Sequence, residues 1–364
     1  MRTVCVMGAG ASKHAGYPLI SGMGKRWLDW MAAYPNGYFR GSVDLLLQRF
    51  GSDPNIEDVI TEMDSSIHSL ADSDVLEDRL QRTLLGNTLG QLNAGLREWF
   101  RELRLHGAHA YAEFAANVIQ PGDIVITFNY DDSLERELRC AGKWDISHGY
   151  GFLLGSVEQS SPVLVLKLHG SINWLASIFG SVTSGAAQVD LDSSIGQQPV
   201  IHKADLEFLG YSDFEGYTYP GGGAFPSLIL PGRKKEFFFR SSLGIEWKPF
   251  FDHLWSQASA ALKHTDKVVI CGYSLLPVDE RGCDLILRNP NKRTKVEIVC
   301  GSQGNRLEND FRDAGYADVS VDATGYFEDW VERTAQEQTR KENLKVDQVV
   351  RALDGGTPVL KLPH

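Results

Sequence analysis

The sequence predicts an α/β protein built on a parallel sheet with helices on both faces. Five short runs of apolar, largely β-branched residues recur along the 364-residue chain, and each ends at glycine or at polar residues. Continuous apolar runs of this length are typical of strands that are covered on both sides. Segments with helical spacing of apolar residues lie between them, and this alternation is typical of α/β folds. The five runs are residues 3–7, 123–127, 163–168, 267–271 and 296–300.

The third run leads directly into a candidate functional group. Residues 163–174 read VLVLKLHGSINW, so the apolar run stops at His169. In open α/β sheets, ligands bind in the crevice beyond the carboxyl ends of the strands. A lone histidine at a strand end more often fixes a loop, but the other four runs also end in turns that suit a site on the same rim. These turns are Gly8-Ala9-Gly10-Ala11-Ser12, Thr127-Phe128-Asn129-Tyr130-Asp131, Gly272-Tyr273-Ser274 and Gly301-Ser302.

Composition restricts the classes of function. With 43% apolar and 23% charged residues, the chain is typical of soluble globular proteins. Its net charge of −11 argues against direct binding of nucleic acid, because such domains are usually basic. No apolar run approaches the ~20 residues that span a bilayer. A glycine-rich turn stands where a signal peptide would continue, so we expect a cytoplasmic protein that does not bind membranes.

The five cysteines predict reduced thiols rather than a metal site. No two of them are spaced as a C-x-x-C pair, which is the usual unit of a structural zinc site. Cys5, Cys271 and Cys300 lie in or at the ends of apolar runs, where buried thiols are the usual outcome. His106 and His109 have no acidic or thiol partner nearby, and we interpret them as surface residues. The sequence therefore predicts neither zinc nor another metal.

Residues 25–118 predict a helical insertion between the first two strands. Apolar residues recur at helical spacing around Trp27 and again over residues 56–67. Asp53 and Pro54 are expected to open the second of these helices, as its N-cap and its first helical residue. Two further helices are expected, over residues 76–92 and 96–114.

Two helices are expected near the predicted sheet. After the second strand, Asp132 or Ser133 is expected to cap a helix that runs through Leu138 and stops at Gly142. Residues 247–262 form the most amphipathic helix in the sequence, and it leads into the fourth strand. The second connection suits a right-handed crossover between parallel strands.

The remaining segments are less regular, although the chain, 1–364, is expected to form a single domain. Residues 176–245 predict an irregular insertion, polar at first and then rich in aromatic residues. Its first part, 177–198, can act as a lid over the site. Residues 326–364 predict a charged helical tail that contacts a second subunit or another protein.

The turn from Gly8 to Ser12 leaves two interpretations open. A Gly-x-Gly turn after a strand can present bare backbone N–H groups to a phosphate. The dinucleotide fingerprint G-x-G-x-x-G is not completed, because Lys13 occupies the position of its third glycine. A glycine turn that serves only the geometry of the chain is the alternative.

The turns at the strand ends resemble the motifs of the sirtuin superfamily, in the same order along the chain. The turn at residues 8–12 is similar to the first phosphate loop, and residues 127–131 to the Thr-x-Asn-x-Asp element. Residues 167–171, Lys-Leu-His-Gly-Ser, are similar to the element with the catalytic histidine, and residues 272–275 to the segment for the distal ribose and phosphate. Residues 54–64 look like the helical insertion of the bacterial branch. The resemblance implies a Rossmann-like sheet and an NAD+ site.

Two departures distinguish this sequence from deacylating sirtuins. Those enzymes carry two cysteine pairs for zinc and an Asp-Phe-Arg segment after the first glycines, and this sequence has neither. What remains resembles bacterial NAD+ hydrolases of anti-phage defence, toxic effectors that deplete NAD+ when a sensor partner activates them. The resemblance implies a separate sensor, first a HerA-type ATPase and second a short Argonaute. Because unrestrained loss of NAD+ would kill the host cell, we also expect a homo-oligomer, with the helical tail as a contact.

Cleavage of the nicotinamide–ribose bond requires a clamp on the pyrophosphate, groups that hold ribose and water, and a base. Three residues receive catalytic roles: Asn129 orients water against ribose, Asp131 binds the carboxamide or steadies positive charge, and His169 accepts a proton. Ser274 is expected on the adenosine side, and backbone N–H groups of the first turn serve as the clamp. The binding residues are Gly8, Ala9, Gly10, Ala11, Ser12, Thr127, Gly272, Tyr273 and Ser274.

Three other functions are alternatives to NAD+ hydrolysis. The same residues would serve a module that senses NAD or ADP-ribose without cleaving it. A serine hydrolase using Ser274 and His169 is disfavoured, because Leu276 replaces the last glycine of the G-x-S-x-G elbow. Residual lysine deacylation is disfavoured by the two departures above.

Overall fold

The computed structural model describes residues 2–103, 109–145, 149–151, 161–177, 224–232 and 248–354. In these residues, six parallel strands form one sheet in the order β3-β2-β1-β6-β7-β8, which confirms the predicted fold class. The sheet also contains a strand that the sequence analysis missed, β8, because three residues are too few to show a pattern. The strands are β1 Thr3–Met7, β2 Ile124–Thr127, β3 Leu164–Lys167, β6 Lys267–Cys271, β7 Lys295–Val299 and β8 Val319–Val321.

The register of the sheet aligns the ends of its central strands. Met7, the last residue of β1, lies beside Thr127 of β2 and Cys271 of β6. Thr127 in turn lies beside Lys167, the last residue of β3. Since the strands are parallel and end at one level, the turns that follow them begin side by side.

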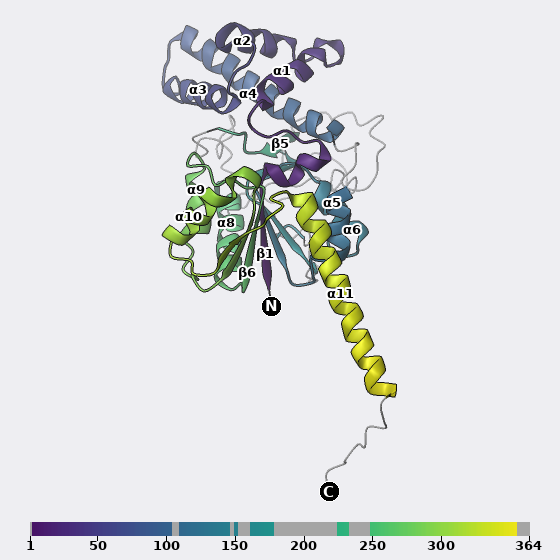
Figure 1. Cartoon of the computed structure of the whole chain (residues 1–364). Coiled ribbons are helices and arrows are strands. Elements are labelled where there is room, and N and C mark those ends of the chain that lie inside the picture. Colours follow the sequence, from purple (N-terminus) through teal and green to yellow (C-terminus); the bar gives the residue numbers. More distant parts are fainter. Residues whose placement is uncertain are drawn as a thin grey trace.

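Helices cover both faces of the sheet, as Figure 1 shows. In that view α5, α6 and α11 lie on the right of the sheet, and α8, α9 and α10 on the left. This arrangement follows from right-handed crossovers in both directions from β1. The helices are η1 Ala9–Ala15, α5 His109–Glu113, η4 Phe114–Val118, α6 Ser133–Cys140, α8 Lys248–Lys263, α9 Glu280–Leu287, η6 Gly301–Gln303, α10 Gly304–Asp313 and α11 Phe327–Asp354.

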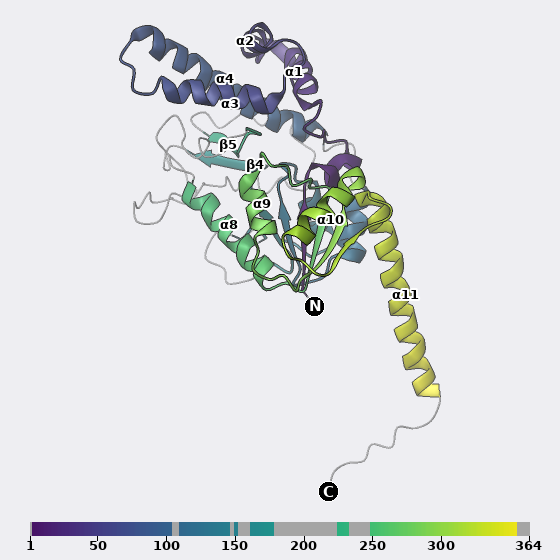
Figure 2. The same ribbon diagram turned by 60° about the vertical axis from the view of Figure 1, so that its left-hand side comes forward.

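A second hydrophobic core lies in the helices of the insertion, above the carboxyl ends of the strands (Figure 1). Tyr17, Tyr130 and Ile172 belong to this core, so it reaches down to the loops of the rim. A two-stranded antiparallel sheet, β4 Gly170–Ser177 with β5 Ala224–Leu228, lies between the insertion and the main sheet (Figure 2). The insertion contains α1 Met23–Ala33, η2 Pro35–Gly37, α2 Arg40–Phe50, α3 Ile56–Ser69 and α4 Leu76–Leu103.

The expected N-cap of α3 was wrong. The cap is Asn55, whose side-chain oxygen accepts hydrogen bonds from the backbone N–H groups of Glu57 and Asp58. Pro54, which was expected as the first helical residue, lies outside the helix. It packs against α1, where a Cβ atom at Gly24 would lie 2.3 Å from Pro54 O.

The two helices expected over residues 76–92 and 96–114 are a single helix to Leu103, followed by α5 and η4. Gly95 lies inside α4, and a Cβ atom there would come within 3.0 Å of the Met31 sulfur. The glycine allows close contact with α1 and does not end the helix.

The C-terminal helix divides into two parts. Phe327, Trp330, Val331 and Ala335 are buried in the main core, against η1, α5 and η4. The rest of α11 extends away from the sheet (Figure 2). The expected irregular insertion at 176–245 and the lid at 177–198 lie almost wholly outside the described residues.

Candidate functional site

The loop after β1 packs directly against the loop after β6. The Gly8 N–H donates to Cys271 O and the Gly10 N–H to Gly272 O, each over 3.0 Å. A Cβ atom at Gly8 or Gly10 would lie 2.7 Å from the backbone of the second loop, and one at Gly272 would lie 2.2 Å from Ala11 N. Gly272 also has a φ of 60°, which side chains rarely adopt. The geometry of the chain therefore requires these glycines.

These contacts leave fewer backbone N–H groups for the expected phosphate clamp. The N–H groups of Gly8 and Gly10 are engaged with the second loop, and the Ala11 N–H donates to Gly8 O over 2.9 Å. The Ala9 N–H makes no hydrogen bond within the described part of the chain, and Ala9 lines the cavity described below. One backbone donor of the turn, rather than the whole turn, is available to an anion.

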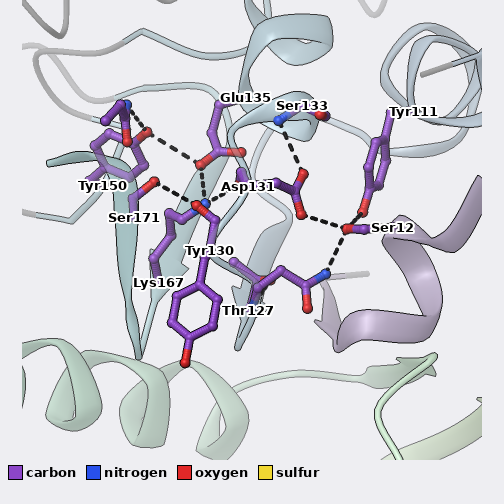
Figure 3. Close-up of polar contacts among 12 residues, drawn as sticks. Ser12, Tyr111, Thr127, Tyr130, Asp131, Ser133, Glu135, Tyr150, Lys167 and Ser171 are labelled. Atoms are coloured by element: carbon purple, nitrogen blue, oxygen red, sulfur yellow. Dashed lines mark hydrogen bonds and ion pairs between the residues drawn. The ribbon is translucent and has the colours of Figure 1, made fainter. Parts of the chain in front are cut away.

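Ser12 is the centre of a buried hydrogen-bond network (Figure 3). Its hydroxyl donates to Asp131 Oδ2 over 2.7 Å, accepts from Asn129 Nδ2 over 2.9 Å and lies 2.7 Å from the Tyr111 hydroxyl. A serine hydroxyl has one proton and two lone pairs, so Tyr111 must be the donor in the third contact. Ser12 thereby joins η1, α5 and the loop after β2.

Asn129 is fixed in one orientation. Its Nδ2 also donates to Gly8 O over 2.9 Å, and a carbonyl oxygen only accepts, so the nitrogen must face this side. Its backbone N–H donates to Thr127 Oγ1 over 3.1 Å. The side-chain oxygen makes no hydrogen bond to the described residues, and Asn129 lines the cavity. The group that Asn129 offers to a ligand is therefore an acceptor.

Asp131 is buried, and both of its carboxylate oxygens accept hydrogen bonds. Besides the Ser12 hydroxyl, the Ser133 N–H at the start of α6 donates to Oδ1 over 3.2 Å. Asp131 therefore stabilises the end of α6, while the side chain of Asp132, one of the two expected caps, makes no capping bond. Burial raises the pKa of Asp131, and the nearby charge of Lys167 opposes this shift.

Lys167 and Glu135 form a buried ion pair beneath the site (Figure 3). Lys167 Nζ lies 2.8 Å from Glu135 Oε1 and also donates to Asp131 O. The side chains are 0% and 1% exposed. Burial raises the pKa of Glu135, and the charge of Lys167 counteracts it. The pair connects the end of β3 to the loop after β2 and to α6.

His169 follows β3 and lies among aromatic side chains. Its ring meets that of Phe128 edge-on, with centroids 5.1 Å apart, and Phe128 stacks on Tyr273 at 4.0 Å. His169 Nε2 lies 3.9 Å from Asp279 Oδ2. The His169 backbone oxygen accepts from the Ile229 N–H over 2.9 Å, which fixes the main chain at this point.

These side chains surround a cavity of about 660 Å³ at the carboxyl ends of β1, β2, β3, β6 and β7. This volume lies within the range of ligand sites, roughly 300–1,000 Å³. All the residues assigned from the sequence line it, except two. Ala11 is buried behind the turn, and Thr127 is buried where it accepts the Asn129 N–H.

Among the described lining residues of the cavity, carboxylates outnumber cations. Lys13 is the only lysine or arginine among the described lining residues, and its ammonium lies 5.8 Å from the Tyr326 ring, beside α11. The acidic lining residues are Glu57, Asp131 and Asp279. Asp279 lies beside His169, and the charges of Glu57 and Asp279 both raise the pKa of Tyr130. The carboxylates of Asp279 and Glu57 therefore lie on the side of His169 and Tyr130, whereas Asp131 is bonded to Ser12, the residue next to Lys13.

Sequence analysis missed several residues of the site. Tyr111 and Asp279 come from segments with no recognisable motif, and Glu57 lies in the insertion at residues 54–64, to which no site role was assigned. Only the fold brings these residues to the rim. Lys167 did carry a signal, because a lysine inside a strand covered on both faces must be paired. Its partner Glu135 follows four residues after Asp131 on the next helix of the same rim.

Neither a metal cluster nor a membrane helix is found in the described residues. They contain no group of three or more histidine, cysteine, aspartate or glutamate side chains placed to hold a metal ion. No helix in the same residues combines the length and apolar character needed to cross a bilayer.

Fold and site together define an α/β protein with a ligand cavity at the carboxyl ends of a parallel sheet. No protein-family model matches the chain, and no curated protein matches it significantly in sequence. The chain is distantly similar in structure to Sir2 enzymes over most of its length.

Three solved structures illustrate this similarity. One, from work on the mechanism and regulation of Sir2 enzymes, is 15% identical with a TM-score of 0.38, over 92% of this chain and 93% of its own. A Sir2 homologue in complex with 2′-O-acetyl-ADP-ribose is 13% identical with a TM-score of 0.42, over 93% and 92%. A Sir2 homologue in complex with NAD is 13% identical with a TM-score of 0.38, over 93% and 90%.

Proposed function

We propose that the protein is an NAD+ hydrolase that cleaves the nicotinamide–ribose bond and releases ADP-ribose and nicotinamide. The observation that carries this proposal is the charge distribution along the cavity. NAD+ has a negative pyrophosphate and a positive pyridinium ring at opposite ends of the nicotinamide ribose. In the cavity, the Lys13 ammonium offers a partner for the pyrophosphate, and the Asp279 carboxylate beside His169 offers one for the pyridinium ring.

The pocket residues suit the chemistry of this bond. Cleavage passes through a state with positive charge on the ribose, as in glycoside hydrolysis, and the carboxylates near His169 favour that charge. His169 takes one proton from the attacking water while the new C–O bond forms. Nicotinamide leaves with the electron pair of the C–N bond as a neutral ring. The Asn129 oxygen accepts from a ribose hydroxyl or from the water, and the His169 proton returns to solvent.

The wider role that we propose is that of a toxic effector in bacterial anti-phage defence. It rests on the motif resemblance and on the absence of the zinc cysteines from the sequence. Unrestrained loss of NAD+ would kill the host cell, so a homo-oligomer controlled by a separate sensor is part of the proposal. A HerA-type ATPase fits this role first, and a short Argonaute second.

The test is incubation of purified protein with NAD+, alone and with the product of its genomic neighbour, followed by chromatography of nicotinamide. Release of nicotinamide in proportion to loss of NAD+ supports hydrolysis. Binding of NAD+ or ADP-ribose without any release, in both preparations, would instead support a sensor module.

We expect the protein to contain no stoichiometric zinc and to leave acetyl-lysine peptides intact. The reason is that the sequence has neither the cysteine pairs nor the Asp-Phe-Arg segment of deacylating sirtuins. Elemental analysis and mass spectrometry of the peptides check the two halves. One zinc per chain would contradict the first half, and NAD+-dependent deacetylation the second.

Removal of the outer part of α11 is expected to reduce the oligomer without unfolding the protein. A chain that ends after Arg340 keeps the buried Phe327, Trp330 and Ala335, whereas it lacks Leu344 and Val346, which are 53% and 59% exposed. Light scattering of both versions measures the change, with circular dichroism as the check on folding. Equal masses for the two versions would show that oligomer contacts lie elsewhere.

A further inference from the structure

Asp279 lies at the N-cap position of α9, but its side chain does not cap the helix. An aspartate at this position normally accepts a hydrogen bond from the first turn, which stabilises the helix by about 1 kcal/mol. Here the carboxylate faces the cavity, where Oδ2 accepts the Tyr273 hydroxyl proton over 2.7 Å. The Asp279 side chain therefore bonds to Tyr273 at the site and makes no capping bond to the first turn of α9.

Tyr273 holds this carboxylate in a fixed position. Its ring stacks on Phe128 with an angle of 6° between the planes. On the other side, a Cβ atom at Gly282 would lie 2.1 Å from the Tyr273 hydroxyl, so α9 approaches it as closely as its backbone allows. Burial raises the pKa of Tyr273 well above its usual value, so the hydroxyl keeps its proton.

The same carboxylate oxygen lies 3.9 Å from His169 Nε2. This distance is too long for a hydrogen bond but short enough for a strong attraction between charges. His169 gains a positive charge when it accepts a proton, and Asp279 is the carboxylate that lies nearest to that charge in the described residues. Catalytic contacts of this kind are often long before the substrate binds.

We propose that Asp279 is a positioning residue that stabilises the protonated form of His169, and that Tyr273 fixes it for this purpose. The inference deepens the proposed NAD+ hydrolysis and rests on it. His169 remains the group that touches the reacting water. Asp279 acts through His169, by raising the basicity of the imidazole and by attracting the imidazolium that forms during bond cleavage.

Other groups that face this pair come from several elements, and they do not replace Asp279. Burial raises the pKa values of Tyr130, Tyr273 and Cys283, the last to about 11, so these groups stay neutral near pH 7. Asp131 is engaged by Ser12 and Ser133. Among the lining residues that the structure describes, the remaining charged groups are Glu57 and Lys13.

The test replaces Asp279 by asparagine in the full-length protein and measures the pKa of His169 directly. NMR titration of protein with ¹³C-labelled histidine gives this value, and the spectrum of His169→Gln identifies the signal. Loss of an opposite charge at this distance is expected to lower the pKa of His169 by about 1–3 units. Glu280→Gln is the matched control, since it neutralises the next, exposed carboxylate and should leave the signal unmoved.

Kinetics supply the second measurement. The acid limb of the pH–rate profile is expected to move to lower pH by the same amount in Asp279→Asn, because His169 then keeps its neutral form in more acidic solution. The kcat value is expected to fall about tenfold or more with KM nearly unchanged. Asp279→Glu keeps the negative charge, so its kcat and the position of its acid limb should lie between those of the wild type and of Asp279→Asn.

The outcomes separate this inference from the proposed function. An unmoved His169 pKa in folded Asp279→Asn would overturn the role of Asp279, even if the enzyme cleaves NAD+. A shifted pKa in a protein that cleaves no NAD+ would overturn the proposed function and leave the pairing intact. Asp279→Ser provides a second neutral variant if the asparagine variant does not fold, and it must show the same shift.

Discussion

Replacement of His169 by alanine is expected to lower NAD+ cleavage by about 10²–10⁴-fold, the usual contribution of a general base. Asn129→Ala is expected to have an effect of the same order. It removes the acceptor that faces the cavity together with the two hydrogen bonds that hold Gly8 and Ser12. Nicotinamide release measured by chromatography at saturating NAD+ gives the loss in kcat.

Two surface variants serve as matched controls for these substitutions. His264 and Asn117 are exposed and lie outside the cavity, so alanine at either position should leave turnover unchanged. Thermal unfolding shows whether each variant keeps its fold. Turnover within a few-fold of wild type in folded His169→Ala would remove the histidine from the mechanism.

Replacement of Lys167 by methionine is expected to destabilise the protein by about 3–5 kcal/mol, because it leaves Glu135 as an unpaired charge in the interior. The double variant Lys167→Met/Glu135→Leu is expected to regain most of this loss, since a buried ion pair can often be exchanged for apolar side chains. Urea unfolding followed by fluorescence measures the free energy of unfolding. Activity should fall in both variants, because the Asp131 backbone oxygen loses its donor.

A surface ion pair supplies the comparison for this prediction. Lys25 and Asp29 lie 2.5 Å apart, but their side chains are 54% and 64% exposed. Such pairs contribute little because water screens the charges, so Lys25→Met should leave the unfolding curve almost unchanged. Equal effects at Lys25 and Lys167 would show that burial of the pair has no energetic consequence.

The sequence by itself determined the sheet and the catalytic candidates. The five apolar runs gave strands that are parallel and end on one rim, because periodicity and apolar continuity are local properties. Parallel strands must end on the same side. The positions of Asn129 and His169 at adjacent strand ends therefore followed without knowledge of packing.

Features that depend on contacts between distant segments could not be predicted. Gly95 lies within α4, where Met31 of α1 packs closely against it. The cap of α3, in contrast, is a local choice, because Asn55 rather than Asp53 accepts the N–H groups of Glu57 and Asp58. The glycine N–H groups of the first turn bind another loop of the protein instead of a phosphate. This depends on the contact between Gly10 and Gly272, which lie more than 260 residues apart in the sequence.

Only the tertiary structure decided the environment of the site. It places Asp279 against His169 and pairs Lys167 with Glu135 in the interior. No local pattern encodes these pairs, because electrostatic interactions depend on distance and burial rather than on separation along the chain. The sequence determined which groups reach the rim, and the folded chain decided which charges they meet there.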